Sequence, residues 1–133
     1  MTSEEDKAAG RDAILTSFGW NRWDSVDPFT FLDLLKKRPD RTLFLHNAPK
    51  GWIQSRHIEG LVALVDSAAP ASATCDLISP HMPPKGFCST IGQEAARMVE
   101  CYRFAWSYPV GCSDLDRVDV QEIKQWWRRE QKK

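Results

Sequence analysis

The residues of this sequence that could carry out catalysis are its histidines and cysteines: His46, His57, His81, Cys75, Cys88, Cys101 and Cys112. An imidazole that contacts a thiol can take its proton and leave a nucleophilic thiolate. Cys88 follows His81 by a few residues, and His57 is the other candidate base. A small enzyme that uses Cys88 with His81 or His57 is therefore one hypothesis, although no local cysteine-protease signature is present.

The spacing of the cysteines is not typical of a metal site. They are separated by gaps of twelve, twelve and ten residues, whereas a zinc site usually draws two thiolates from one C-x-x-C turn. The sequence also lacks a P-loop, a dinucleotide fingerprint, HExxH and G-x-S-x-G. We therefore predict no metal and no cofactor, and free thiols unless the protein is exported.

A tryptophan doublet, Trp126–Trp127, marks the carboxy-terminal region. On a helix the two rings point about 100° apart. Trp127 shares a face with Val120 and Ile123 and is predicted to lie in the core, whereas Trp126 lies on the flank beside Arg128. Trp126 and Arg128 are candidate partner-binding residues. The alternative is that Trp126 covers a neighbouring helix.

A proline-rich stretch, SPHMPPKGFC, is the preferred functional loop. Stiff apolar loops lose little entropy when they dock on a partner. Its candidate contact residues are Met82, Pro83, Pro84 and Phe87. The alternative is that Phe87 packs under the next helix while the prolines only shape the turn. Trp52, the aromatic residue of the related tetrapeptide PKGW, completes the predicted partner-binding set.

Capping signals predict the helices that must position these residues. Ser3 precedes a helix near residues 4–18, and Asp27 with Pro28 begins a helix over 28–38. Ser55 precedes a helix over 56–66 with a one-sided apolar stripe. Thr90 begins a helix from 91 that reaches 104 or 106, and Asp119 begins a last helix that runs through 129. Two short apolar runs, RTLFLHNAP and CDLI, are left unassigned because they are too brief for periodicity to classify.

The tetrapeptides PKGW at 49–52 and PKGF at 84–87 each precede a predicted capped helix. Proline and glycine suit a turn that redirects the chain, and an interval of about 35 residues is typical of helix-pair repeats. We therefore predict an all-α fold of about five helices, with HEAT- or TPR-like helix-hairpin repeats as one form of it. Residues 1–133 are predicted to form one domain, in which 1–26 is a looser amino-terminal cap.

Composition limits the classes of partner. The 133 residues contain 18 Lys and Arg and 18 Asp and Glu, so no overall charge attracts nucleic acid or an anionic membrane. No apolar run is long enough to span a bilayer, and the polar, acidic start does not resemble a secretory signal, which favours a cytoplasmic protein. We predict a non-catalytic protein–protein interaction module, an adaptor or an immunity-type inhibitor. The Cys/His enzyme is the alternative.

Overall fold

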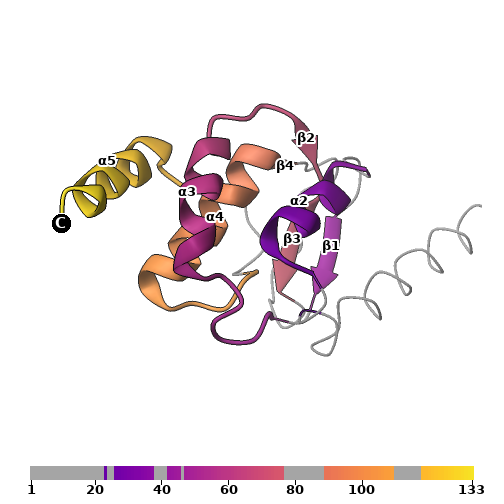
Figure 1. Cartoon of the computed structure of the whole chain (residues 1–133). Coiled ribbons are helices and arrows are strands. Elements are labelled where there is room, and N and C mark those ends of the chain that lie inside the picture. The colour runs from indigo at the N-terminus through magenta and orange to yellow at the C-terminus, as the bar shows by residue number, and fades with distance from the viewer. Residues whose placement is uncertain (1–22, 24–25, 38–41, 46, 77–88, 110–117) are drawn as a thin grey trace, which may run out of the picture.

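The computed structural model describes residues 23, 26–37, 42–45, 47–76, 89–109 and 118–133. This part of the chain is mostly helical, with short strands between the helices (Figure 1). In chain order the elements are α2 (Pro28–Lys36), β1 (Thr42–Leu45), α3 (Ser55–Leu64), β2 (Pro70–Ala71), β3 (Ala73–Asp76), β4 (Ser89–Thr90), α4 (Ile91–Phe104) and α5 (Val120–Gln131).

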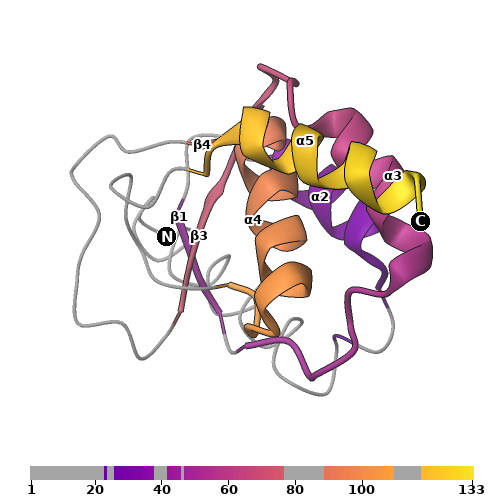
Figure 2. The same cartoon turned by 90° about the vertical axis from the view of Figure 1, so that its left-hand side faces the viewer.

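The strands form two pairs. β1 lies parallel to β3, with Thr42 opposite Ala73 and Leu45 opposite Asp76, and β2 lies antiparallel to β4. Parallel neighbours need a crossover connection, and α3 lies in it. The pair β1–β3 stands on one side of α2, α3 and α4 (Figure 2). The prediction of a strictly all-α fold is therefore wrong, because two apolar segments that were too short to classify alone become strands by pairing with each other.

Three predicted helix starts are confirmed by side-chain caps. Asp27 Oδ1 accepts a hydrogen bond from Thr30 N at 2.7 Å, and Thr90 Oγ1 accepts one from Gln93 N at 3.0 Å. Asp119 Oδ1 accepts from the amides of the first turn of α5. Such caps satisfy amides that have no partner inside the helix. Helices α2 and α3 each end two residues before the predicted ends at 38 and 66.

The start of α3 differs from the prediction. Its cap residue is Gln54 rather than Ser55, and His57 Nδ1 accepts a hydrogen bond from Gln54 N at 3.0 Å. The side chain of Gln93, in the first turn of α4, accepts a hydrogen bond from Val118 N, before α5, at 3.3 Å. The sequence therefore placed the start of α3 one residue too late, and it did not predict that Gln93 bonds to the residue two before α5.

Helices α3 and α4 approach closely at Gly92. Gly92 N donates to Ser67 O at 3.1 Å, and a Cβ at this position would lie 2.5 Å from Val65 O. Helix α5 lies across α3 and α4 (Figure 2). It is held by the buried side chain of Ile123 and by an ion pair between Lys124 and Asp66.

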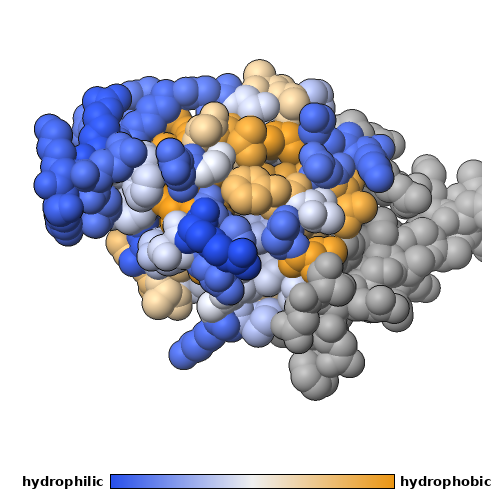
Figure 3. Space-filling view, in the orientation of Figure 1, coloured by the Kyte–Doolittle hydropathy of each residue, from blue (hydrophilic) through white to orange (hydrophobic). Residues whose placement is uncertain are grey.

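Four aromatic rings from separate segments meet in the core: Trp23, Phe31, Trp52 and Tyr108. The Trp23 ring centroid lies 4.7 Å from that of Trp52 and 5.1 Å from that of Phe31. Trp52 Nε1 donates to Trp23 O at 3.0 Å and to Val26 O at 2.9 Å, so its only polar atom is satisfied inside the protein. Around this core, apolar side chains also gather on the face over α2 and α3 (Figure 3).

The helix predicted over 4–18, most of the cap predicted over 1–26 and the second tetrapeptide lie outside the described residues. The described part contains four helices, so the fifth helix and the helix-hairpin repeat stay predictions. Among the described helices, none has the length and apolarity that crossing a membrane would need.

Candidate functional site

Large aromatic side chains are exposed where α4 ends. The exposed fractions are 39% for Tyr102, 46% for Phe104 and 54% for Trp106, and these are the exposed large apolar residues of the described part. Helix α4 ends because Ala105 takes left-handed backbone angles, with φ 56°, and Trp106 N then donates to Cys101 O at 2.9 Å. The turn places the Trp106 ring 5.0 Å from the Phe104 ring.

The segment after α4 is fixed to the segment after β1. Asn47 Nδ2 donates to Ser107 O at 3.2 Å and to Pro109 O at 2.7 Å, and Ala48 N donates to Tyr108 O at 2.7 Å. These bonds join residues that lie about sixty positions apart in the sequence. The two segments therefore form one bonded unit next to the exposed aromatic rings.

A buried polar cluster around the Glu94 carboxylate holds Tyr108 in place. The Glu94 carboxylate, 1% exposed, accepts hydrogen bonds from Thr74 Oγ1 at 2.6 Å, Tyr108 OH at 2.7 Å and Ser89 Oγ at 2.7 Å. Arg97 pairs with it at 3.2 Å. Burial and the neighbouring carboxylate raise the pKa of Tyr108 well above its usual value. Burial alone would lower the pKa of Arg97, but Glu94 and Tyr108 outweigh it and raise that pKa.

A cavity of about 280 Å³, the aromatic pocket, lies between residues 48–53 and the end of α4. Its wall includes the side chains of Trp52, Ile53, Tyr102, Trp106 and Tyr108, and the Ala105 cap lies between them. Lys50 is the charged residue of this lining. An apolar concave site of this kind suits an apolar side chain of a ligand.

The exposed rings continue onto α5. The Trp126 ring lies 6.5 Å from the Tyr102 ring, and the Arg103 guanidinium lies over the rings of Phe104 and Trp126 at 4.9 and 5.2 Å. Arg103 also pairs with Glu100 at 3.0 Å and with Glu122 at 3.3 Å. We call the set Tyr102, Arg103, Phe104, Trp106 and Trp126 the aromatic surface.

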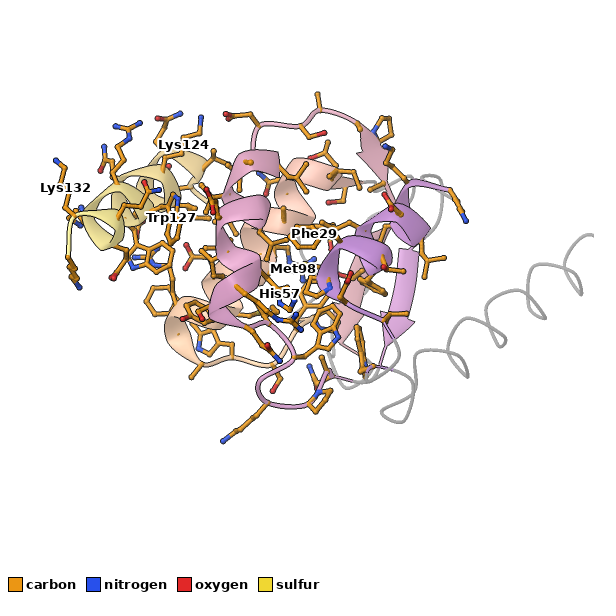
Figure 4. All side chains as sticks on the ribbon, in the orientation of Figure 1. Phe29, His57, Met98, Lys124, Trp127 and Lys132 are labelled. Atoms are coloured by element: carbon orange, nitrogen blue, oxygen red, sulfur yellow. The ribbon has the colours of Figure 1, made fainter. Side chains whose placement is uncertain are left out.

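Helix α5 carries charges beside this surface. Lys124, Trp127 and Lys132 lie along it at one end of the molecule (Figure 4), and the face of the helix that Figure 3 shows is mostly hydrophilic. Arg128 is exposed, and its role in partner binding stays a prediction. Trp126 and Trp127 are both half-buried, so the predicted division into a core ring and a surface ring is not found.

A second cavity, of about 440 Å³, shares the residues Pro49–Trp52 with the aromatic pocket. We call it the polar pocket, because its lining includes Asp27, Lys50, Gln54, Arg56 and His57. The tetrapeptide 49–52 is thus a common wall of two neighbouring cavities, one mainly apolar and one mainly polar.

His57 is the buried polar side chain of this second cavity, with an exposed fraction of 6%. Because its Nδ1 accepts from Gln54 N, the neutral ring carries its hydrogen on Nε2. Nε2 has no hydrogen-bond partner among the described residues. Burial and the nearby Arg56 charge lower the pKa of His57, while Asp27 acts in the opposite direction. The His57 ring also packs edge-on against Phe29 at 5.9 Å (Figure 4).

The structure separates the predicted partner-binding residues. Trp126 belongs to the aromatic surface, whereas Trp52 is 9% exposed and lies in the core, where it contributes to both pockets. Met82, Pro83, Pro84 and Phe87, with His81 and Cys88 of the enzyme hypothesis, lie outside the described residues. Sequence reasoning missed Phe104 and Trp106 as site residues. Their position four and two residues before YPVG, at the point where the helix must stop, was the available signal.

The described residues contain no group of three or more His, Cys, Asp and Glu side chains that could hold a metal ion. Cys101 is a free thiol, and burial raises its pKa to about 12. Comparison of the chain with protein-family models, with curated proteins and with solved structures finds no match in any of the three.

Proposed function

We propose that this protein is a non-catalytic protein-binding module that contacts its partner through the aromatic surface. The observation that carries the proposal is the exposure of Tyr102, Phe104 and Trp106 together at one helix end. Aromatic residues and arginine are enriched at protein interfaces and supply most of their binding energy. A contiguous apolar patch on a protein surface is typical of an interaction site.

Contacts inside the fold hold the aromatic surface in a fixed arrangement, and this favours the same function. The hydrogen bonds from Asn47 and Ala48, and the burial of Tyr108, fix the backbone that carries Trp106. Arg103, held by two carboxylates, lies over both the Phe104 ring and the Trp126 ring and restricts their movement. Little side-chain and backbone freedom is then lost on binding, so more of the contact energy contributes to affinity.

Within protein-binding roles, we propose an adaptor or an immunity-type inhibitor that acts in the cytoplasm, with the helix-hairpin repeat as the form of its scaffold. The Cys/His enzyme that uses Cys88 with His81 or His57 stays the alternative, because Cys88 and His81 lie outside the described residues. Of its three residues, His57 is described, and its Nδ1 atom accepts the Gln54 amide.

Affinity capture with matched baits tests the proposal. The wild-type chain and the double variant F104A/W106A are immobilised and exposed to the same lysate, with the double variant K36A/K37A, at the exposed end of α2, as the control. We expect a partner that the wild type and the control retain in equal amounts and that the F104A/W106A bait loses by about tenfold or more. Equal recovery on all three baits, with all three folded by circular dichroism, would contradict the proposed surface.

A further inference from the structure

We propose that the tetrapeptide 49–52 is the centre of a two-part site for an acidic segment of the partner protein. The segment places an apolar side chain in the aromatic pocket and a carboxylate in the polar pocket. This inference rests on the proposed function and specifies the chemistry of the partner. It also assigns a role to the sequence PKGW that its use as a turn before a helix does not explain.

The tetrapeptide is anchored in the core by its last residue, and its first three residues face solvent. We call it the ridge. Trp52 N donates to Pro49 O at 3.1 Å, which closes the turn, and the Trp52 side chain is bonded into the core. Pro49, Lys50 and Gly51 are exposed. Gly51 has φ +83°, and a Cβ built on it would meet no atom within 4 Å. A partner segment can therefore lie across Gly51 without meeting a side chain of the ridge.

The two sides of the ridge differ in chemistry. On one side, the rings of Tyr102 and Trp106 with Pro49 form an apolar wall. Aromatic walls of this type accept proline, aliphatic or aromatic side chains of extended peptides. On the other side, Lys50 and Arg56 are cationic, and the Arg56 Nε bond to Gln54 Oε1, at 2.9 Å, sets its position.

The charges of the polar pocket favour a carboxylate. Asp27 is its acidic residue, and the Thr30 amide holds the pKa of that carboxyl below its usual range, so Asp27 remains ionised and offsets one of the two cations. Among the described residues of the lining, one positive charge remains, in addition to the positive end of the α3 dipole. His57 supplies the second, independent observation. Its buried Nε2–H has no acceptor among the described residues, and a carboxylate oxygen would provide one.

The pairing of the two pockets distinguishes a protein segment from a free anion. A free phosphate or acetate would use only the polar pocket and would leave the aromatic wall open to water. A segment with an acidic residue a few positions from an apolar one fills both. The single charge in the lining of the aromatic pocket, Lys50, belongs to both cavities and is also positive.

Selection from a library of random heptapeptides displayed on phage, with the folded full-length chain as target, tests the inference. We expect the enriched peptides to contain Asp or Glu near a proline, aliphatic or aromatic residue. The best peptide and its Glu→Gln or Asp→Asn counterpart are then titrated by tryptophan fluorescence at low salt. The acidic form should bind about tenfold more tightly. K50A/R56A should remove that preference, while K36A/K37A should keep it.

A second variant separates the binding role of His57 from its structural role. His57→Gln keeps an acceptor at the helix position that bonds to Gln54 N, and loses the ring N–H. We expect this variant to melt like the wild type at pH 7.5 and to bind the acidic peptide about threefold to tenfold less tightly. Inorganic phosphate and acetate, titrated alone, should show no saturable binding below about 10 mM, since one of the two contacts is missing.

Different experimental results would overturn the two-part site and the protein-binding function. Enriched peptides that carry no acid, or that bind K50A/R56A as well as the wild type, would overturn the two-part site. If such peptides still lose binding to F104A/W106A, the proposed function stands. Tight binding of phosphate alone would also overturn the inference, in favour of a free anion. Failure to enrich any peptide would count against both proposals.

Discussion

At the scale of single residues, burial limits the reactivity of the Cys101 thiol. Its thiol is 3% exposed, and burial raises its pKa to about 12. Almost no thiolate exists at neutral pH, and thiolate is the reactive form. We predict that iodoacetamide at pH 7.4 leaves Cys101 unmodified in the folded chain over hours and labels it in guanidinium chloride. Mass spectrometry of the peptide that contains Cys101 provides the measurement. Labelling of the folded chain at the rate of the denatured chain would contradict the burial.

The lowered pKa of His57 predicts how stability depends on pH. The folded protein binds fewer protons at this site than the unfolded chain, whose imidazole titrates near 6.5. The stabilising contribution is therefore fully present above pH 6.5 and is lost as the pH falls through the lower folded value. We expect urea unfolding to show a decline in the free energy of unfolding between pH 7.5 and pH 5.

The variant H57Q is the matched control for this prediction, because glutamine does not titrate and can still accept the Gln54 amide bond. Its free energy of unfolding should decline less than that of the wild type over the same pH range. Equal declines in the two proteins would assign the pH dependence to groups other than His57.

At the scale of elements, the contact between α3 and α4 depends on Gly92. A methyl group there would lie 2.5 Å from Val65 O and 2.6 Å from Ser67 O, and both atoms are backbone. We predict that Gly92→Ala lowers the free energy of unfolding by about 3 kcal/mol, because the helices must move apart to accommodate it. Denaturant unfolding followed by tryptophan fluorescence gives the value.

Gly60 offers a matched comparison within α3. A Cβ at Gly60 would meet the tip of the Phe29 ring at 2.6 Å, and a half-buried ring can turn where a carbonyl group cannot. The gain in helix propensity, about 1 kcal/mol, then offsets part of the cost. Gly60→Ala should remain within about 1 kcal/mol of the wild type. A similar loss in both variants would show that the α3–α4 approach is no more rigid than the Phe29 contact.

The elements also show what the sequence could and could not predict. Asp27, Thr90 and Asp119 were identified as helix starters because a cap depends on residues within one turn. The strands β1 and β3 were not identified, because each is four residues long and is stabilised by the other from a distant part of the chain. The His57 bond to Gln54 was missed because histidine is not a usual partner in a capping box.

At the scale of the whole molecule, exposure decides which aromatic residues form the site, and exposure depends on every element. Trp52 and Trp106 are both tryptophans in polar loops near prolines, yet one is 9% exposed and the other 54%. Trp52 is buried because its segment returns over Trp23 and Phe31, and Trp106 is exposed because the αL turn at Ala105 directs it outward. The sequence predicted α5 and identified Trp126 as a candidate partner-binding residue. It could not predict which tryptophan side chains are buried and which are exposed.

The Glu94 cluster joins the parts that the chain separates: it connects α4 to β3 through Thr74, to β4 through Ser89 and to the segment after α4 through Tyr108. Removing one member of a buried ion pair takes the nearest opposite charge away from the other member, which is costly inside a protein. We predict that E94Q lowers the free energy of unfolding by about 3 kcal/mol and R97Q by about 2 kcal/mol.

The double variant E94Q/R97Q should lose at least about 1 kcal/mol less than the sum of the two single losses, because the ion pair between the two side chains is lost only once. A double-mutant cycle in guanidinium chloride measures this difference. The solvent-accessible pair Glu130–Lys133, at the end of α5 and just beyond it, is the matched control, and its cycle should show no measurable coupling, since solvent screens it. Additive losses for Glu94 and Arg97 would mean that the hydroxyl donors alone satisfy the buried carboxylate. The support of Tyr108, and with it the fixed position of Trp106, would then depend on neutral hydrogen bonds and not on the ion pair.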